Sequence, residues 1–181
     1  MKRSSWETRD ADVCWHPYTQ HALDQETLPV VRASGAWLEL ADGRRILDAI
    51  SSWWSILHGH AHPKIVRAIQ QQAEKLDHVL FAGCTHEPAV KLAEGLLELA
   101  PRGLSKVFYS DSGATSVEVA LKAAYLTHLR QGKEGRHIFL ALHDSYHGDT
   151  VGAMSVGDPQ PFFQDFAPLL FQVERVSPNA N

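Results

Sequence analysis

Cysteine is scarce in this chain of 181 residues, which contains only Cys14 and Cys84. The two do not form a C-x-x-C pair, so neither a disulfide framework nor a zinc knuckle is indicated. Positive charge is scarce as well, because the net charge is −4 and no basic block exists that could neutralise a run of nucleic-acid phosphates. These absences argue against a disulfide-stapled protein and against a nucleic-acid-binding protein.

Long apolar runs are also missing. No run approaches the roughly 20 residues that a membrane span requires, and residues 1–12 are polar, without the apolar centre of a signal peptide. We therefore expect a cytoplasmic protein that does not bind membranes. The apolar fraction of 44% is ordinary for a globular protein, and the length suits about one domain with its own core.

Neither common glycine-rich nucleotide motif occurs. The absence of G-x-x-x-x-G-K-S/T excludes a Walker loop, and the absence of G-x-G-x-x-G leaves a dinucleotide-binding fold with little support. The chain instead contains a small polar turn, Ser110–Thr115, between a strand predicted at 104–109 and a predicted helix. Glu118 and Lys122 are expected to pair on the surface of that helix. Its apolar face is indicated by residues at helical spacing: Val117, Ala120, Leu121 and Ala124.

The turn Ser110–Thr115 has the composition of an anion site. The first N–H groups of a helix lack internal partners and lie at the positive end of its dipole, and Gly113 lets a phosphate approach the backbone closely. Ser112 and Thr115 could add hydroxyl donors. On the residues alone, an ordinary helix N-cap without a ligand is the stronger interpretation, and a phosphate site is the alternative.

A second strand is predicted at 136–141, and a strand, a helix and a strand in succession indicate a parallel βαβ unit. Ligands of such sheets bind at the carboxyl ends of the strands. Those ends are Ser110–Thr115 and residues 142–150, so the two segments can lie side by side. Tyr146, in the second segment, has a ring that could stack on a flat ligand. Further elements are expected as a helix at 150–155 and a strand within 169–176.

Asp42-Gly43 between two apolar runs predicts a β-hairpin over about 37–50. Ser51-Ser52-Trp53-Trp54 follows directly. On an extended segment adjacent rings point to opposite sides, so one tryptophan is expected to pack and the other to face a ligand pocket. A purely structural role for both is equally compatible with the residues. Tyr18, next to Pro17, could likewise either pack in the core or form the wall of a pocket, and for Tyr18 the core is favoured.

The run His58-Gly59-His60-Ala61-His62-Pro63 invites a metal site. Gly59 and Pro63 break regular structure, however, and no carboxylate or cysteine lies nearby at ligand spacing. We therefore expect no metal here. The favoured interpretation is a turn that leads into a helix over 63–78, with Pro63 at its first position.

The phosphate turn and Val117–Lys122, together with Tyr146-His147-Gly148, resemble the class III aminotransferases, which are pyridoxal-phosphate enzymes of fold type I. The resemblance covers about residues 13–158. It implies an α/β fold that is a partial fold type I transferase with a mostly parallel sheet. Residues 1–55 would be an amino-terminal segment of the small domain with the hairpin, and residues 56–181 would be the first, incomplete part of the cofactor-binding large domain.

Two further segments, Trp15–Thr19 and Ser51–Trp54, are similar to the branch of this family that works in biotin biosynthesis. That branch transfers the amino group of S-adenosylmethionine to 8-amino-7-oxononanoate and gives 7,8-diaminononanoate. The resemblance implies pyridoxal 5'-phosphate as cofactor, small-molecule substrates, and a homodimer when the protein is full length. The alternatives are another class III aminotransferase and a non-catalytic fragment that binds a phosphate ligand.

The resemblance also implies a role for each candidate residue. Gly113 and Ala114 would give backbone N–H groups to the cofactor phosphate, and Tyr146 would lie against the pyridine ring and near the substrate. The substrate site would be walled and completed by three aromatic residues, namely Trp53, Trp54 and Tyr18, of which Trp53 is the more direct contact.

The chain departs from the family at two points. Ala114 stands where the family usually has a hydroxyl residue, so a side-chain bond to the phosphate is absent unless Thr115 or Ser112 supplies it. None of the seven lysines lies in the context of the lysine that forms the Schiff base with the cofactor. We therefore expect no catalytic residue within this stretch, and we expect the chain alone to be inactive.

Overall fold

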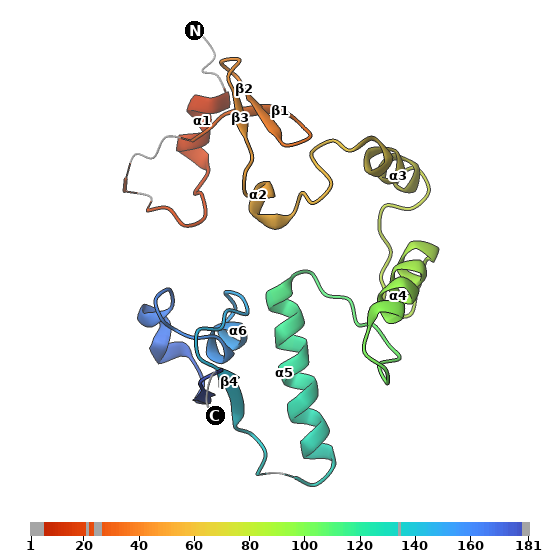
Figure 1. Cartoon of the computed structure of the whole chain (residues 1–181), viewed down its shortest axis with the longest axis vertical. Coiled ribbons are helices and arrows are strands. Elements are labelled where there is room, and N and C mark those ends of the chain that lie inside the picture. The colour runs from red at the N-terminus through yellow and green to blue at the C-terminus, as the bar shows by residue number, and fades with distance from the viewer. Residues whose placement is uncertain (1–5, 21, 24–26, 134, 179–181) are drawn as a thin grey trace. The chain divides into compact units, whose positions relative to one another are not determined.

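The computed structural model describes residues 6–20, 22–23, 27–133 and 135–178. By contacts the chain forms two compact units, unit 1 with residues 1–85 and unit 2 with residues 86–181. Figure 1 shows the elements of each. Within the described ranges, no helix has the length and apolar character that crossing a membrane would need. The assignment of residues 1–55 and 56–181 to a small and a large domain stays a prediction.

Unit 1 is built on a three-stranded antiparallel sheet with the order β1-β2-β3 (Figure 1). β2 (Trp37–Leu40) and β3 (Arg45–Leu47) form the predicted hairpin. Gly43 takes a φ of 86° at its turn, a conformation that glycine adopts without strain. β1 (Val30–Ser34), which the sequence analysis missed, pairs with β2 and buries Leu40 at the sheet's centre.

Helices flank this sheet in the sequence. α1 (Trp6–Val13) occupies the first described residues. α3 (Pro63–Ala73) begins with proline in its first turn, as predicted, but it ends at Ala73 instead of His78. The chain turns there because the N–H of Lys75 bonds the carbonyl of Gln72 at 3.0 Å, a three-residue spacing that tightens the last turn.

Unit 2 contains α4 (Glu87–Leu99), α5 (Gly113–Arg130), α6 (Val151–Val156) and a 3₁₀ turn, η1 (Gln164–Leu169). Its two strands, β4 (Phe139–Leu142) and β5 (Val173–Val176), are parallel neighbours, with Phe139 opposite Val173. The strand predicted at 136–141 is confirmed with shifted bounds as β4, and the strand predicted within 169–176 is confirmed as β5. The helices predicted after residues 112 and 150 are confirmed as α5 and α6.

The strand predicted at 104–109 is wrong. Residues 104–110 form no ladder within the described part of the chain, and the N–H of Leu104 turns back to the carbonyl of Pro101 at 3.3 Å. A strand needs a neighbouring strand to bond its backbone N–H and C=O groups. The apolar pattern of residues 104–109 does not show whether such a neighbouring strand exists. The parallel pair therefore joins β4 to β5 and not to residues 104–109.

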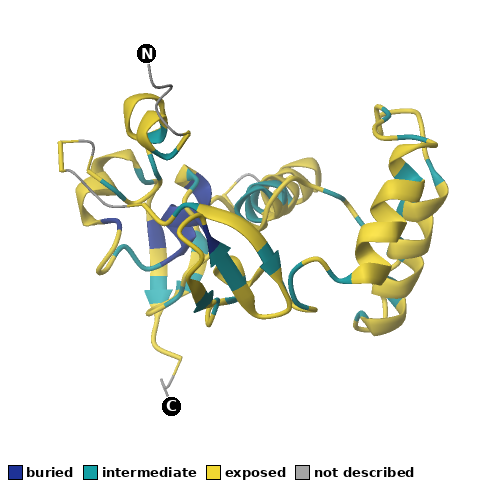
Figure 2. Ribbon diagram, turned by 90° about the horizontal axis from the view of Figure 1, so that it is seen from above, coloured by how far each residue is buried: buried dark blue, intermediate teal, exposed yellow. Residues whose placement is uncertain are grey.

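The core of unit 2 is centred on α6, whose residues from Gly152 to Val156 are buried; Figure 2 colours the buried residues of the chain dark blue. Gly157 is buried as well, and α6 contacts both α5 and β4. The guanidinium of Arg175 donates to the carbonyls of Ser155 and Gly157, each at 2.8 Å, and so ties α6 to β5. Around it lie buried apolar side chains: Ala153, Met154, Val156, Phe163 and Val173. This packed centre supports the segments that carry the candidate site.

Candidate functional site

The turn before α5 is a capping box. Ser112 is the N-cap: its Oγ accepts the N–H of Thr115 at 3.2 Å, and the N–H of Ser112 donates to Thr115 Oγ1 at 2.8 Å. Thr115 Oγ1 also donates to the carbonyl of Ser112 at 2.9 Å. Both hydroxyls are therefore engaged in closing the helix end, as the N-cap interpretation predicts.

The N–H groups of Gly113 and Ala114 differ from those of their neighbours. Among the described residues, neither has a hydrogen-bond partner, whereas the next two N–H groups along the helix are bonded to Ser112. They belong to the first turn of an 18-residue helix, where the dipole is positive. The turn thus presents two adjacent backbone donors with the character of an anion site.

The loop after β4 lies directly against this turn. A Cβ on Gly148 would be only 2.5 Å from Ala114 Cβ and 2.9 Å from Ala114 Cα. Gly148 also has a φ of 126°, which residues with a side chain rarely adopt. The close approach brings the segments after residues 109 and 142 together, as the sequence analysis anticipated from their place in the chain.

Glu118 forms a second link between the same segments. Its Oε1 accepts the hydroxyl of Thr150 at 2.6 Å and the N–H of Gly152 at 2.7 Å. These hydrogen bonds, led by the one from Thr150, lower the pKa of the half-buried Glu118 carboxyl. The prediction that Glu118 pairs mainly with Lys122 on the surface is therefore wrong, because its carboxylate turns inward to the start of α6.

Tyr146 lies in the loop that Gly148 and Thr150 anchor. Its hydroxyl donates to Asp149 Oδ1 at 3.1 Å, and its ring stacks on Phe163 with centroids 6.1 Å apart. Burial, followed by the Asp149 carboxylate, raises the pKa of the tyrosine hydroxyl. The ring is thus held in place and still largely exposed.

A carboxylate also fixes the start of this loop. Asp158 Oδ2 accepts the N–H of Asp144 at 2.9 Å and lies 3.5 Å from His143 Nδ1. Asp144 has a φ of 58°, so the bond holds a residue in the left-handed region. The two backbone bonds from Asp144 and Gln160 are the leading causes that lower the pKa of Asp158.

In unit 1, Tyr18 and Trp53 are stacked face to face. Their ring centroids are 5.4 Å apart and their planes differ by 6°. We call this pair the aromatic platform. Both rings are largely exposed, as is Trp54. A core role for Tyr18, which was favoured from the residues alone, is therefore wrong.

The tryptophans do not lie on an extended segment. α2 (Ser51–Trp54) is one turn with left-handed backbone, in which φ is 50° at Ser51, 46° at Ser52, 60° at Trp53 and 67° at Trp54. Such a conformation costs about 1–2 kcal/mol for each residue that has a side chain. Four in succession require strong local interactions to hold them.

Asp48 supplies those interactions. Its Oδ1 accepts the N–H of Ser52 at 2.9 Å, and its Oδ2 accepts Ser52 Oγ at 2.8 Å and is hydrogen-bonded to His60 Nε2 at 2.8 Å. The Asp48 side chain is 5% exposed and that of His60 is 13% exposed. The bonds from Ser52, then that from His60, lower the pKa of Asp48 to about 2.

Sequence reasoning missed Asp48. Its spacing of four from Ser52 is a side-chain-to-backbone pattern, but the same spacing occurs in many contexts without a bond. His60, which was weighed as a metal ligand, is instead the partner of this carboxylate. Among the described residues, no group of three or more His, Cys, Asp or Glu side chains could hold a metal ion.

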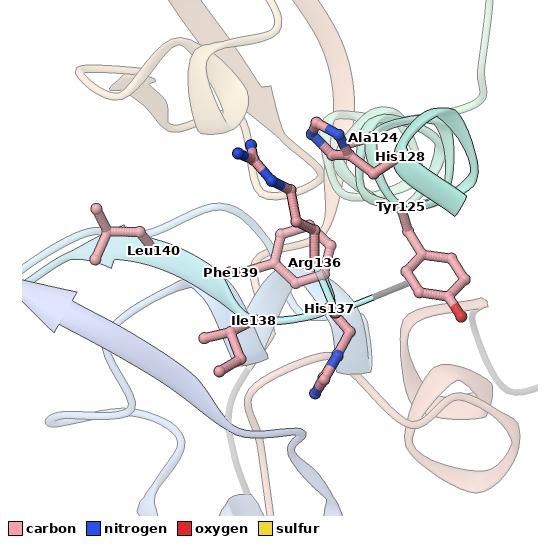
Figure 3. Close-up of a pocket in the computed structure, with 9 residues that line it drawn as sticks. Ala124, Tyr125, His128, Arg136, His137, Ile138, Phe139 and Leu140 are labelled. Carbon is pink, nitrogen blue, oxygen red and sulfur yellow. The ribbon is translucent and has the colours of Figure 1, made fainter. Parts of the chain in front are cut away.

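A shallow pocket of about 420 Å³ lies at the other end of α5 from the phosphate turn (Figure 3). Tyr125 and His128 line it from α5, and residues 135–140 line it from the chain that leads into β4. No candidate residue from the sequence analysis contributes to it. The candidate residues therefore form two groups, one in each unit: the aromatic platform with Trp54, and the phosphate turn with Tyr146.

These features define a class of protein. The sequence profile of the family "Aminotransferase class-III" matches residues 18–181, and the chain belongs to this family. Class-III aminotransferases depend on pyridoxal phosphate, and the α/β fold is a partial fold type I transferase.

Particular relatives carry a narrower name. The chain is 52% identical over 160 residues to the adenosylmethionine-8-amino-7-oxononanoate aminotransferase of Synechococcus elongatus, covering 88% of this chain and 38% of the relative. It is 43% identical over 165 residues to that of Aquifex aeolicus, covering 90% of this chain and 36% of the relative.

Solved structures agree with this likeness. The crystal structure of the enzyme of that name from Methanocaldococcus jannaschii has a TM-score of 0.88 and 41% identity, over 96% of this chain and 40% of that one. The omega transaminase from Pseudomonas jessenii in complex with PMP has a TM-score of 0.86 and 30% identity, over 96% of this chain and 39% of that one. The chain thus spans less than half the length of these relatives.

The contact between Gly148 and Ala114 predicts that Gly148→Ala destabilises the protein. The added methyl would overlap Ala114 and would strain a left-handed residue, so we expect a loss of roughly 1–3 kcal/mol in the free energy of unfolding. Urea unfolding followed by circular dichroism measures it. Gly95→Ala is the matched control, since Gly95 lies within α4 with open space around it; it should stabilise by roughly 0.5–1 kcal/mol. Equal effects of the two substitutions would contradict the close contact.

The lowered pKa of Asp48 predicts a pH dependence of stability. The pKa of Asp48 is about 2 in the folded chain, against an ordinary value of 3.8. The ionised Asp48 carboxylate therefore contributes its full share of the unfolding free energy above pH 3.8. The contribution decreases below that value and is lost as the pH falls through about 2. The difference in unfolding free energy between the wild type and Asp48→Ala should therefore be constant near neutral pH and shrink in acid. A difference that does not change in acid would contradict the assignment.

Proposed function

We propose that this chain is part of a pyridoxal-phosphate-dependent aminotransferase of biotin biosynthesis, which transfers the amino group of S-adenosylmethionine to 8-amino-7-oxononanoate. The observation that carries the proposal is the 52% identity to the Synechococcus elongatus enzyme, whose name states this donor and acceptor. The aromatic platform supports it, because Tyr18 and Trp53 come from the two segments that resemble this branch of the family.

The residues present fit the phosphate of the cofactor. Gly113 and Ala114 offer adjacent backbone N–H groups at the positive end of α5, and Gly113 has open space around it. The hydroxyls of Ser112 and Thr115 bond each other's backbone, so they hold the turn in shape and contribute to the phosphate at most secondarily. Ala114 would serve through its backbone N–H, which remains available although the side-chain hydroxyl is missing.

Pyridoxal phosphate, when bound, carries the amino group between the two substrates. Tyr146 would lie against its ring, since the bond to Asp149 and the stack on Phe163 fix the tyrosine in one orientation. Because burial and Asp149 raise the pKa of the Tyr146 hydroxyl, the hydroxyl keeps its proton at neutral pH and maintains its hydrogen bond to Asp149.

The aromatic platform and Trp54 would form the substrate wall. The amino donor is a bulky sulfonium nucleoside, and the amino acceptor is a long apolar amino-ketone. Flat aromatic rings accommodate both shapes. The faces of Tyr18 and Trp53 also attract a cation, which suits the sulfonium. We further propose that the whole protein is a cytoplasmic homodimer that binds small molecules and neither nucleic acid nor membranes.

A chimera tests the proposed reaction. The 181 residues would replace the matching segment of the Synechococcus elongatus relative, and transfer from S-adenosylmethionine to 8-amino-7-oxononanoate would be measured. We expect this donor to be used in preference to alanine and to simple amines, because the segment contributes Tyr18, Trp53 and Trp54. Turnover with amines but not with S-adenosylmethionine would point instead to another class III aminotransferase.

Substitutions of Gly113 test the phosphate site. Gly113→Pro removes one of the two proposed N–H donors at the first helical position, where proline is tolerated, and Ser112 already has the extended backbone that precedes proline. We expect the affinity for pyridoxal phosphate, measured by absorbance titration, to fall about tenfold or more, since a bond to a charged group is lost. Gly113→Ala keeps the N–H and should retain the affinity. Equal affinities of the two variants would contradict the site.

A further inference from the structure

The left-handed turn of α2 has no explanation in the proposed reaction itself. Residues 51–54 all have side chains, and all have positive φ. Tyr18, the other member of the platform, also has a positive φ, of 60°. Two stacked rings therefore stand on backbone that would relax to other conformations if nothing held it.

The group that holds the turn is itself fixed to the sheet. The N–H of Asp48 bonds the carbonyl of Ala36 at 2.9 Å, and His60 exchanges backbone bonds with Gly35, 2.8 and 3.1 Å long. Gly59 approaches the same point so closely that a Cβ there would lie 3.1 Å from Gly35 Cα. Asp48 and His60 are thus anchored on neighbouring residues at the β1–β2 turn.

The Asp48 carboxylate is almost fully covered. It accepts two bonds from Ser52 and one with His60, and its side chain is 5% exposed. Its charge is therefore directed into the turn. By contrast, Asp42, in the turn between β2 and β3, is exposed, and its carboxylate accepts hydrogen bonds from Arg44, two residues further along.

We propose that Asp48 is a positioning residue, which holds Ser51–Trp54 in its left-handed turn and so places Trp53 face to face with Tyr18. The use of this platform for a substrate rests on the proposed function, but the positioning itself does not. The hydrogen bonds of Asp48 go to Ser52 and His60, so Asp48 acts on Trp53 through the backbone of Ser52. Loss of its acceptors should release the turn and separate the two rings.

The test uses the 181-residue chain labelled with 5-fluorotryptophan. Each of its five tryptophans then carries one fluorine, and comparison with Trp53→Phe identifies the signal of Trp53. Tyr18→Leu then shows the part of the chemical shift that comes from the stacked ring. We expect Asp48→Ala to remove all of that part. Asp42→Ala, the matched control, should leave the Trp53 signal in place.

A rescue separates positioning from a general loss of folding. Ser51→Gly in the Asp48→Ala background removes the steric strain of one positive φ, so the Trp53 signal should move back towards its wild-type position. A loosened fold would be made worse by glycine, which raises the entropy of the unfolded chain. The signal of Trp37, on β2, reports whether the sheet remains folded.

Two outcomes would overturn the proposal: an unchanged Trp53 signal in Asp48→Ala, or a displaced signal that glycine does not restore while Trp37 keeps its position. If Asp48→Ala also displaces the signal of Trp37, the variant Ser52→Ala is used instead, because it removes only the hydrogen bond from Ser52 Oγ. A partial shift of the Trp53 signal in Ser52→Ala supports the proposal, and an unchanged signal refutes it. Turnover of S-adenosylmethionine by the chimera described above tests the substrate separately. A Trp53 signal that depends on Asp48, together with a chimera that does not use S-adenosylmethionine, would count against the proposed function and leave the positioning intact.

Discussion

Carboxylates that accept backbone N–H groups hold the irregular segments of both units. Asp48 bonds the N–H of Ser52, Glu118 that of Gly152, and Asp158 that of Asp144. In each case the acceptor is a charged oxygen, which makes the bond stronger than one between neutral groups. Two of the three hold backbone with positive φ, at Ser52 and at Asp144. The candidate site residues stand on, or next to, the segments that these carboxylates fix.

Polar tethers have this importance because the apolar core is small. Buried apolar side chains in unit 2 gather around α6, and Leu40 is the one buried apolar residue among the described residues of unit 1. A turn that no core covers cannot be held by packing, so hydrogen bonds to ionised groups must define its geometry. Such tethers also leave the faces of Tyr18, Trp53 and Tyr146 open, whereas burial in a core would have covered them.

The sequence predicted those elements whose signals are local. The hairpin follows from Asp42-Gly43, α5 from its apolar spacing and α6 from its place after the polar loop. The left-handed turn could not be foreseen, because serine and tryptophan normally avoid positive φ and the cause lies elsewhere in the chain. Asp48 and His60 are 12 residues apart, and Glu118 and Thr150 are 32 apart. The strand predicted at 104–109 failed for the same reason, since its pattern does not specify a neighbour.

Ala114 shows how the two kinds of information combine. From the resemblance, its lack of a hydroxyl predicts a weaker hold on a phosphate. In the structure its methyl group lies against Gly148, at a distance that leaves no room for a Cβ on that glycine. The side chain at 114 therefore governs how closely the Tyr146 loop approaches α5, while the backbone N–H remains directed to the helix end. Under the proposed function, position 114 would therefore bear on the cofactor ring through the Tyr146 loop as well as on the phosphate, and a larger residue there would push the loop away from α5.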